Sequence, residues 1–412
     1  MWKPRVYIAV IFVAFTICVA ITAFAIYMIL RRKKNTKLHH GSSCKSVDLE
    51  LQQLGLSTRT VSENKVSFES SSQKVVVVME SFTVEELTAA TGDFCSSNLI
   101  EGSVYHGRLN GKNLAIKRTD QNTISKINFN LFHDATHFHP NVVRLLGSCT
   151  AEDMSSADVA AAAGGGFLVF EYAKNGSLKD WIHGGLAMKS HFIASCDCFL
   201  TWNQRVRICL DVATALQYLH LIMNPSYIHK NIKSRNIFLD DEFKAKIGNF
   251  GMEEVESNSS SSLMDRGYIA PEVLLSSGEI DRRIDIYAFG VVLLEIISGK
   301  PPVISKDKSE NEEQGVLLSE KFKCVLRSSN DYAELREWMD NALGENYSFD
   351  SAITLADLAR ACVEDDPLLR PTAGEIVQKL SRLVAELSEV EEEQFSMSES
   401  SSKPLVVKNI CD

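Results

Sequence analysis

An uncharged apolar run near the N-terminus constrains this chain more than any other feature. Val6 to Leu30 reads VYIAVIFVAFTICVAITAFAIYMIL and contains no charged residue. It is longer than the roughly 20 residues that a helix needs to cross a bilayer, and longer than the apolar core of a signal peptide. The run ends in LRRKK, without the small residues of a cleavage site. It therefore predicts one transmembrane helix over residues 6–30, and a cleaved signal peptide is the alternative.

Basic residues flank the apolar run unequally. Two of them lie within residues 1–5, whereas the RRKK run and Lys37 follow it. The more basic flank of a spanning helix stays in the cytosol. We therefore expect a single-pass membrane protein with residues 1–5 as a short extracellular end and a cytosolic C-terminal part. The basic run is either a stop-transfer flank alone or also a contact for anionic lipid headgroups.

The composition is that of a folded domain without a nucleic-acid partner. Hydrophobic residues make up 45% and charged residues 23% of the chain, as in globular proteins. The net charge of -10, with no basic face beyond the RRKK run, argues against nucleic-acid binding. The ten cysteines include no C-x-x-C pair, so we interpret them as reduced thiols rather than a disulfide framework or a zinc site.

The rest of the chain divides into segments of different composition and pattern. Residues 31–80 are rich in Ser, Thr, Lys and Gln, which indicates a flexible juxtamembrane linker. In SFTVEELTAATGDF, Thr83 stands three residues before Glu86, a capping-box pattern that predicts the start of a helix. The Ser- and Glu-rich residues 388–412 predict a disordered tail.

Residues 82–387 predict an α+β fold of two lobes. Four strand-like runs, SVYHGRL, NLAIKR, VVRLLGSC and FLVFEY, place a small β-rich N-lobe over residues 82–172. A helix-like stretch at 124–136 and a loop insertion at 151–166 lie among them. Residues 173–387 form a larger helical C-lobe, in which RIDIYAFGVVLLEIISG predicts a buried helix ending at Gly299.

Eight motifs, in order, resemble a protein kinase. They are LAIK, HPNVVRLLG, LVFEYAKNGSL, IHKNIKSRN, IGNFG, GYIAPE, DIYAFGVVLLEIISGKPP and DDPLLRPTAGEI. SFTVEELTAATGDF and NGSL resemble plant receptor-like kinases. IEGSVYHGRLNGKNLAIK resembles LysM receptor-like kinases, in the branch with a degenerate, pseudokinase intracellular domain. The resemblance implies the bilobal protein-kinase-like fold after one transmembrane helix, and an ectodomain that is absent from this chain.

The resemblance also implies a phosphate-binding loop, which is short here. Kinases cover the phosphates with a G-x-G-x-x-G loop, but Ile100 and Val104 enclose only Glu101, Gly102 and Ser103. Gly102 is what remains of that nucleotide contact, and we expect a tight hairpin without a ligand role.

Lys117 matches the strand lysine that contacts the α- and β-phosphates. The spacing of the family places Asn130 where the glutamate partner of that lysine belongs, and a neutral amide cannot form the ion pair. Asp134 falls where an apolar residue is implied. We therefore expect the helix that carries them to be displaced or loosely held.

The positions of the reacting groups hold amides. Asn231 replaces the aspartate that accepts the proton of the acceptor hydroxyl, and a carboxamide has no basic site near neutral pH. Lys233 and Asn236 match the loop lysine and the second metal ligand. Asn249 replaces the magnesium-binding aspartate, although Mg²⁺ favours carboxylates. The sequence therefore puts binding of both Mg²⁺ and ATP in doubt.

Residues that the resemblance assigns to the structural frame are retained. His229 and Phe250 match the spine of the C-lobe, and Asp285 matches the aspartate that holds the catalytic-loop backbone. Glu272 and Arg370 match a buried ion pair.

The adenine-binding positions are ambiguous. Glu171 and Ala173 would offer hinge backbone groups to a nucleotide. Phe170 stands at the gatekeeper position, and Phe238 stands where a smaller leucine usually contacts adenine. Our hypothesis is that the two rings partly fill the pocket, and an ordinary core pair is the alternative.

Three functions remain open. The first is a plasma-membrane pseudokinase that acts as a scaffold or co-receptor with an active receptor-like kinase, which the resemblance connects to chitin or lipo-chitooligosaccharide signals. The second is an active Ser/Thr receptor-like kinase with atypical residues, which Lys117, Lys233 and Asn236 favour. The third is a truncated product without a role.

Overall fold

A computed structural model describes most of the chain after residue 78. Its described ranges are 79–127, 129–133, 138–150, 165–184, 199–251, 264–275, 280–304, 315–327 and 333–401. The expected transmembrane helix at 6–30 and nearly all of the expected linker at 31–80 lie outside these ranges. Within them, no helix is long and apolar enough to cross a membrane.

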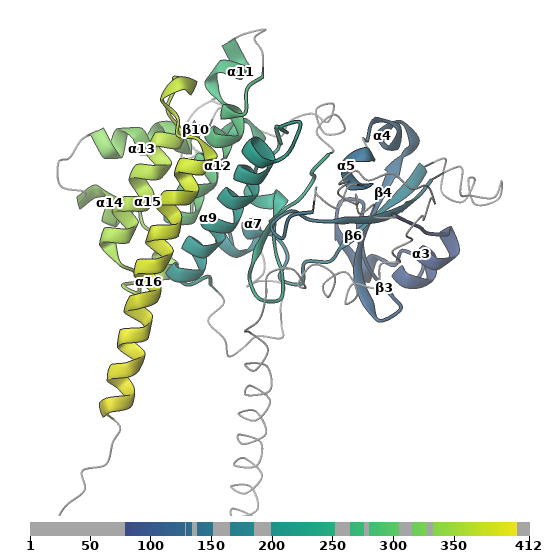
Figure 1. Ribbon diagram of the computed structural model, residues 1–412, viewed down its shortest axis with the longest axis horizontal. Coiled ribbons are helices and arrows are strands. Elements are labelled where there is room, and N and C mark those ends of the chain that lie inside the picture. The colour runs from purple at the N-terminus through teal and green to yellow at the C-terminus, as the bar shows by residue number, and fades with distance from the viewer. Residues whose placement is uncertain are drawn as a thin grey trace, which may run out of the picture. The chain divides into compact units, whose positions relative to one another are not determined.

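The N-lobe is built on a six-stranded sheet (Figure 1). The strand order is β1-β5-β6-β4-β3-β2, in which β1 is parallel to β5 and the other pairs are antiparallel. The strands are β1 (Glu80–Ser81), β2 (Leu99–Glu101), β3 (Val104–Leu109), β4 (Lys112–Asp120), β5 (Leu145–Cys149) and β6 (Gly165–Glu171).

Helix α3 (Val84–Thr91) packs on β3 and begins with the predicted capping box (Figure 1). The Thr83 hydroxyl accepts a hydrogen bond from the Glu86 amide at 3.2 Å, and the Glu86 carboxylate accepts one from the Thr83 amide at 2.9 Å. The predicted helix start is therefore confirmed. Leu87 on this helix is fully buried in the core of the sheet.

The helix-like stretch at 124–136 is not one helix. The structure has α4 (Gln121–Lys126) and α5 (Asn130–His133), and residues 128 and 134–137 lie outside the described ranges. Helix α4 ends because Ile127 takes an extended backbone conformation. Ile127 is buried and belongs to a small cluster with Leu145 and Leu168, so packing against the sheet overrides the helical spacing.

The loop insertion ends two residues earlier than the sequence predicts. Gly165 and Gly166 are the first residues of β6, and they pair with Asp120 and Thr119 of β4. Glycine is a poor strand former, but here it extends the ladder that joins the two central strands. Residues 151–164 lie outside the described ranges.

The C-lobe is helical, as predicted. Its longer helices lie side by side in Figure 1, and α16 packs on α9 while α12 packs on α15. The helices are α7 (Leu178–Ile182), α9 (Trp202–Gln217), α11 (Pro271–Leu275), α12 (Arg283–Ser298), α13 (Leu318–Arg327), α14 (Ala333–Trp338), α15 (Phe349–Cys362) and α16 (Ala373–Ser401), with a π-helical turn η4 (Tyr218–Ile222). The N-lobe also contains the short turn η1 (Ser96–Asn98). Short turns and strands complete the C-lobe: η5 (Ser234–Asn236), η6 (Asp265–Tyr268), η7 (Asn341–Leu343), η8 (Pro367–Leu369), β7 (Ile237–Leu239), β8 (Ala245–Ile247), β9 (Val303–Ile304) and β10 (Val316–Leu317).

Helix α12 is the centre of the C-lobe core. Every residue from Asp285 to Ser298 is buried, and the helix ends at Gly299 in the left-handed conformation. This confirms the predicted buried helix and its end, because glycine takes that conformation without a steric penalty. Since α12 carries both Asp285 and Glu295, the core positions two buried carboxylates beneath the loops that follow α9.

The end of the chain corrects the predicted tail. Helix α16 continues to Ser401, so the helix runs well past the expected boundary at residue 388. The added segment, SEVEEEQFSMSESS, contains several Glu residues, which favour helix almost as much as Ala does. The remainder, 402–412, lies outside the described ranges.

Candidate functional site

Asp285 holds the backbone of the catalytic-loop segment, residues 228–236. Its carboxylate accepts hydrogen bonds from the amides of His229 and Lys230, each at 2.7 Å, and from the His220 ring at 2.9 Å. Asp285 is 1% exposed, so three donors compensate the cost of burying its charge. This placement agrees with the structural role that the resemblance implies.

The His229 side chain links the same segment to the start of the next motif. Its ring donates to the Gly248 carbonyl at 3.0 Å through Nε2 and accepts from the Asn231 amide at 3.3 Å through Nδ1. These two bonds assign the proton to Nε2. The aromatic ring of Phe250 packs nearby on Tyr227, with ring centroids 4.9 Å apart.

Hydrogen bonds to backbone carbonyl groups bring Asn231, Asn236 and the segment before Asn249 together. The Asn236 side-chain amide donates to the Asn231 carbonyl at 2.9 Å. The Gly248 amide donates to the Asn236 carbonyl at 2.7 Å, and Asn249 follows in a left-handed conformation with φ of 62°. The structure therefore brings the predicted base and metal positions into one place, and each position holds a neutral amide.

This donor set does not fit a magnesium ion. Mg²⁺ sites in kinases rely on a carboxylate together with phosphate oxygens. Asn236 already uses its amide nitrogen to fix the loop. The side chains that remain offer no negative charge at the expected ligand positions.

Lys117 lies in the middle of the sheet, opposite Val104 of β3 and Leu168 of β6. Asn130 begins α5, but its side chain and Asp134 fall outside the described part of the chain. No carboxylate in the described ranges forms an ion pair with Lys117. Lys117 therefore keeps its predicted place on the strand, and among the described residues it has no partner of the kind that positions it in a kinase.

The described side chains of helix α5 contact the C-lobe through an aromatic pair. The Phe132 ring meets the Phe250 ring edge-on, with centroids 5.5 Å apart. Leu131 and Phe132 also close over Gly251, where an added Cβ would lie 2.9 Å from the Phe132 ring. The described residues of α5 thus contact the C-lobe, and the expected displacement or loose attachment of this helix stays a prediction.

The short glycine loop forms a tight hairpin between β2 and β3. Gly102 has φ of 56°, which a residue with a side chain rarely adopts. The Arg118 amide of β4 donates to the Ser103 carbonyl at 2.9 Å, which extends the pairing of β3 with β4 up to the turn. Glu101 is exposed and pairs with Val104. The two-residue turn of Gly102 and Ser103 leaves no row of amides to surround phosphates.

At the hinge positions, the side chain of Glu171 makes contacts within the protein. Its carboxylate accepts from the Arg144 amide at 2.9 Å and forms an ion pair with Lys246 at 3.1 Å. Its own amide donates to the Arg144 carbonyl at 3.0 Å. Burial lowers the pKa of Arg144, and Glu171 partly offsets that effect. Lys246 was not predicted because a single lysine on a strand carries no signal in the sequence.

The rings of Phe170 and Phe238 pack in different places. Phe170 lies on the cluster of Ile127, Leu145 and Leu168, whereas the Phe238 ring lies against Gly248, 2.5 Å from the position of an added Cβ. In the described part of the chain, no ring contact joins the two phenylalanines. Ala173 follows the hinge and is half-buried. Whether the two rings partly fill a nucleotide pocket therefore stays a prediction.

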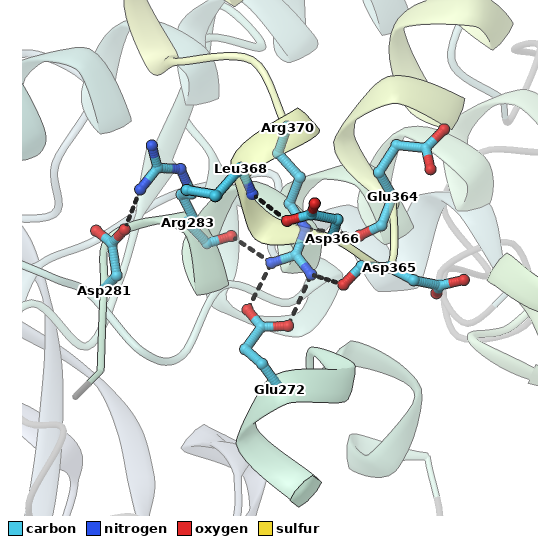
Figure 2. Close-up of polar contacts among 8 residues, drawn as sticks. All are labelled: Glu272, Asp281, Arg283, Glu364, Asp365, Asp366, Leu368 and Arg370. Carbon is cyan, nitrogen blue, oxygen red and sulfur yellow. Dashed lines mark hydrogen bonds and ion pairs between the residues drawn. The ribbon is translucent and has the colours of Figure 1, made fainter. Parts of the chain in front are cut away.

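Glu272 and Arg370 form a bidentate ion pair, which Figure 2 shows at the centre of a ring of carbonyl groups. The two hydrogen bonds measure 2.6 and 2.7 Å. The guanidinium also donates to the carbonyl groups of Glu364 at 2.8 Å and Arg283 at 3.1 Å. The Arg370 side chain is 0% exposed, so this pair ties α11 to η8 and α12.

Asp265 is a site residue that the sequence does not reveal. Its carboxylate lies 3.4 Å from the Lys233 amine and 3.4 Å from the Arg235 guanidinium. The contact with Arg235 joins residues that are 30 positions apart, and no local sequence pattern indicates it. Lys233 therefore has an anionic partner from its own chain.

Comparison with known proteins agrees with this geometry. Residues 100–380 match the family described as protein kinase domain. Protein LYK2 of Arabidopsis thaliana is 39% identical over 99% of this chain and 63% of its own length. Chitin elicitor receptor kinase 1 of Physcomitrium patens is 36% identical over 86% of this chain and 54% of its own length. LysM domain receptor-like kinase 3 of Medicago truncatula is 36% identical over 73% of this chain and 46% of its own length. The chain thus spans about half to two thirds of the length of these relatives.

Proposed function

Because this chain belongs to the protein kinase family and is related to LysM receptor-like kinases, we propose that it is a receptor-like pseudokinase. In this proposal it is anchored in the plasma membrane through residues 6–30, with residues 82–387 as a cytosolic kinase-like domain. The domain acts as a signalling scaffold or co-receptor and does not transfer phosphate itself.

One observation carries the proposal: amides replace carboxylates at both reacting positions of a retained frame. A positioned general base contributes about 10²–10⁴-fold to a rate, and Asn231 cannot supply it. Asn249 and Asn236 bring no negative charge to a dication. The hairpin at Gly102 is a further loss, because it offers few amides to the phosphates.

The frame supports a role that depends on shape. Asp285 fixes the catalytic-loop segment with three hydrogen bonds, and the Glu272–Arg370 pair fixes α11. These residues contribute to structure and not to phosphoryl transfer. A chain that keeps the structural set and lacks the reacting set is suited to binding another protein through a folded surface.

The proposed partner is a catalytically active receptor-like kinase, bound through the kinase-like domain. Such a partner supplies the phosphoryl transfer that this chain lacks. Two of the relatives carry chitin elicitor receptor kinase in their names, which supports chitin or a lipo-chitooligosaccharide as the signal perceived by the complex.

A phosphotransfer assay tests the proposal. The full-length chain, purified in detergent micelles, is incubated with labelled ATP and Mg²⁺ and a protein acceptor. We expect turnover about 100-fold or more below the roughly 1–100 s⁻¹ of active protein kinases. The Lys117→Ala variant is the control, and its residual signal should equal that of the unchanged chain. Transfer at an ordinary rate that Lys117→Ala abolishes would refute the proposal.

That contrary result would instead support an active Ser/Thr receptor-like kinase. Lys117 on β4, together with Lys233 and Asn236 in the catalytic-loop segment, favours this second function. It requires the chain to bypass the amides at positions 231 and 249 and the shortened loop at Gly102.

A measurement of ATP binding tests the role of Phe238 separately from the amides at positions 231 and 249 and the shortened loop. We expect the melting temperature of the full-length chain to change by less than about 1 °C at millimolar ATP, since the ring lies against Gly248. In the Phe238→Leu variant, ATP should raise the melting temperature by about 2 °C, because the smaller side chain leaves space beside Gly248. Phe243→Leu is the matched control, because Phe243 packs on Trp181 rather than on Gly248. Strong stabilisation of the unchanged chain by ATP would contradict the filled-pocket hypothesis.

A further inference from the structure

The carboxylate of Asp265 stands between two cations of the catalytic-loop segment. It lies 3.4 Å from the Lys233 amine through Oδ1 and 3.4 Å from the Arg235 guanidinium through Oδ2. The side chains of Asp265, Lys233 and Arg235 are 14%, 15% and 37% exposed. Partial burial reduces solvent screening, so these charges act on one another more strongly than charges on an open surface.

The turn that carries Asp265 has a second attachment to the same segment. Tyr268, at the other end of η6, donates its hydroxyl to the Glu295 carboxylate at 2.7 Å and lies 3.1 Å from the Ser234 hydroxyl. Burial raises the pKa of Tyr268 well above its ordinary value, and Glu295 adds to that effect. The phenol therefore stays protonated and remains a donor. Asp265 is thus held opposite Lys233 by a fixed turn.

Two convergent cations separated by one residue match the needs of a phosphate group. Arginine and lysine are the side chains that bind phosphate oxygens, arginine by its fork and lysine as a point charge. Here both already face an anion of the chain itself. The carboxylate neutralises part of their charge and occupies the space between them.

We propose that Asp265 is an internal anion that closes, in cis, a phosphate-binding pair formed by Lys233 and Arg235. The chain thereby holds η6 on the catalytic-loop segment without a nucleotide or a phosphorylated side chain. The inference rests on the proposed function, in which no phosphate needs to reach Lys233. In this proposal, Asp265 holds η6 on the catalytic-loop segment, a role that a phosphate bound between Lys233 and Arg235 would otherwise fill.

The test measures the affinity of the full-length chain for inorganic phosphate by isothermal titration calorimetry in detergent micelles. We expect Asp265→Asn, which keeps the shape and removes the charge, to bind phosphate at least tenfold more tightly than the unchanged chain. Asp265→Glu should behave like the unchanged chain. Adding Lys233→Gln to Asp265→Asn should abolish the gain. An equal phosphate affinity in Asp265→Asn and in the unchanged chain would overturn the proposal.

A matched control and a second measurement keep the test decisive. Asp281→Asn removes another carboxylate that pairs with an arginine, Arg283, outside the catalytic-loop segment. It should leave phosphate affinity unchanged. Hydrogen exchange of amides 264–268 should accelerate by a factor of about three in the single variant Lys233→Gln, because it removes one ion pair and a pair of this kind contributes a factor of a few. Unchanged exchange there would overturn the proposal without any need for Asp265→Asn to fold.

The two proposals fail in different ways. Rapid phosphotransfer by the unchanged chain would refute the pseudokinase function whatever the phosphate affinity of Asp265→Asn. Equal phosphate affinities would refute the role of Asp265 whatever the phosphotransfer rate.

Discussion

Arg370→Ala is expected to lower the free energy of unfolding of the kinase-like domain by about 3–5 kcal/mol, the usual cost of removing one partner of a buried ion pair. The Arg370 side chain is 0% exposed and bonds to both carboxylate oxygens of Glu272. The substitution leaves that carboxylate, and the carbonyl groups of Glu364 and Arg283, without their shared donor. Urea unfolding followed by circular dichroism measures the difference.

Arg360→Ala is the matched control for that experiment. Arg360 pairs with Asp357 at 3.8 Å on the surface, where its side chain is 53% exposed. An exposed pair of this kind contributes about 0–1 kcal/mol. If the losses for Arg370→Ala and Arg360→Ala were equal, the frame would not depend on the Glu272–Arg370 pair, and the argument for a retained scaffold would lose its strongest support.

Asp285→Asn is expected to destabilise the same domain by about 3 kcal/mol, although the two side chains have nearly the same shape. The carboxylate accepts from three N–H groups, of which two belong to the backbone of His229 and Lys230. An asparagine must turn its NH₂ group toward at least one of these donors. A buried donor left without an acceptor costs about 1–3 kcal/mol, and the loss of charge weakens the bonds that remain.

Hydrogen exchange locates the effect of Asp285→Asn. Amides 229–236 should lose protection before the rest of the C-lobe, because the bonds that hold their backbone are the ones removed. Asp240→Asn is the control. Asp240 also accepts from two backbone amides, those of Glu242 and Lys244, through a single oxygen. An asparagine at position 240 can keep its oxygen on these two amides and turn its NH₂ group to solvent. The expected loss of unfolding free energy is therefore within about 0.5 kcal/mol. Similar losses in the two variants would mean that Asp285 does not organise the loop.

Local patterns predicted the elements whose stability is local. Thr83 and Glu86 stand at the spacing of a capping box, and both bonds of that box are present. Helix α12 is apolar nearly all round, and it is buried from Asp285 to Ser298. In both cases the residues that decide the structure are near neighbours in the chain, so the sequence contains the necessary information.

Elements that depend on distant contacts were predicted less well. The stretch at 124–136 has helical spacing, but Ile127 leaves the helix to pack with Leu145 and Leu168. The contact of Phe132 in α5 with Phe250 likewise joins two segments that lie far apart in the chain. A pattern within one segment does not report which distant surface that segment meets.

The same division applies to the candidate site. The sequence alone determined which reacting groups are missing, because an asparagine at 231 or 249 has no charge in any fold. It also determined the order of the lobes, since strand-like and helical periodicity are properties of short segments. Only the tertiary structure decided which charges meet. Asp265 faces Arg235, and Lys246 faces Glu171, because the fold brings together residues separated by 30 and 75 positions. Electrostatic energy depends on distance in space rather than on distance along the chain.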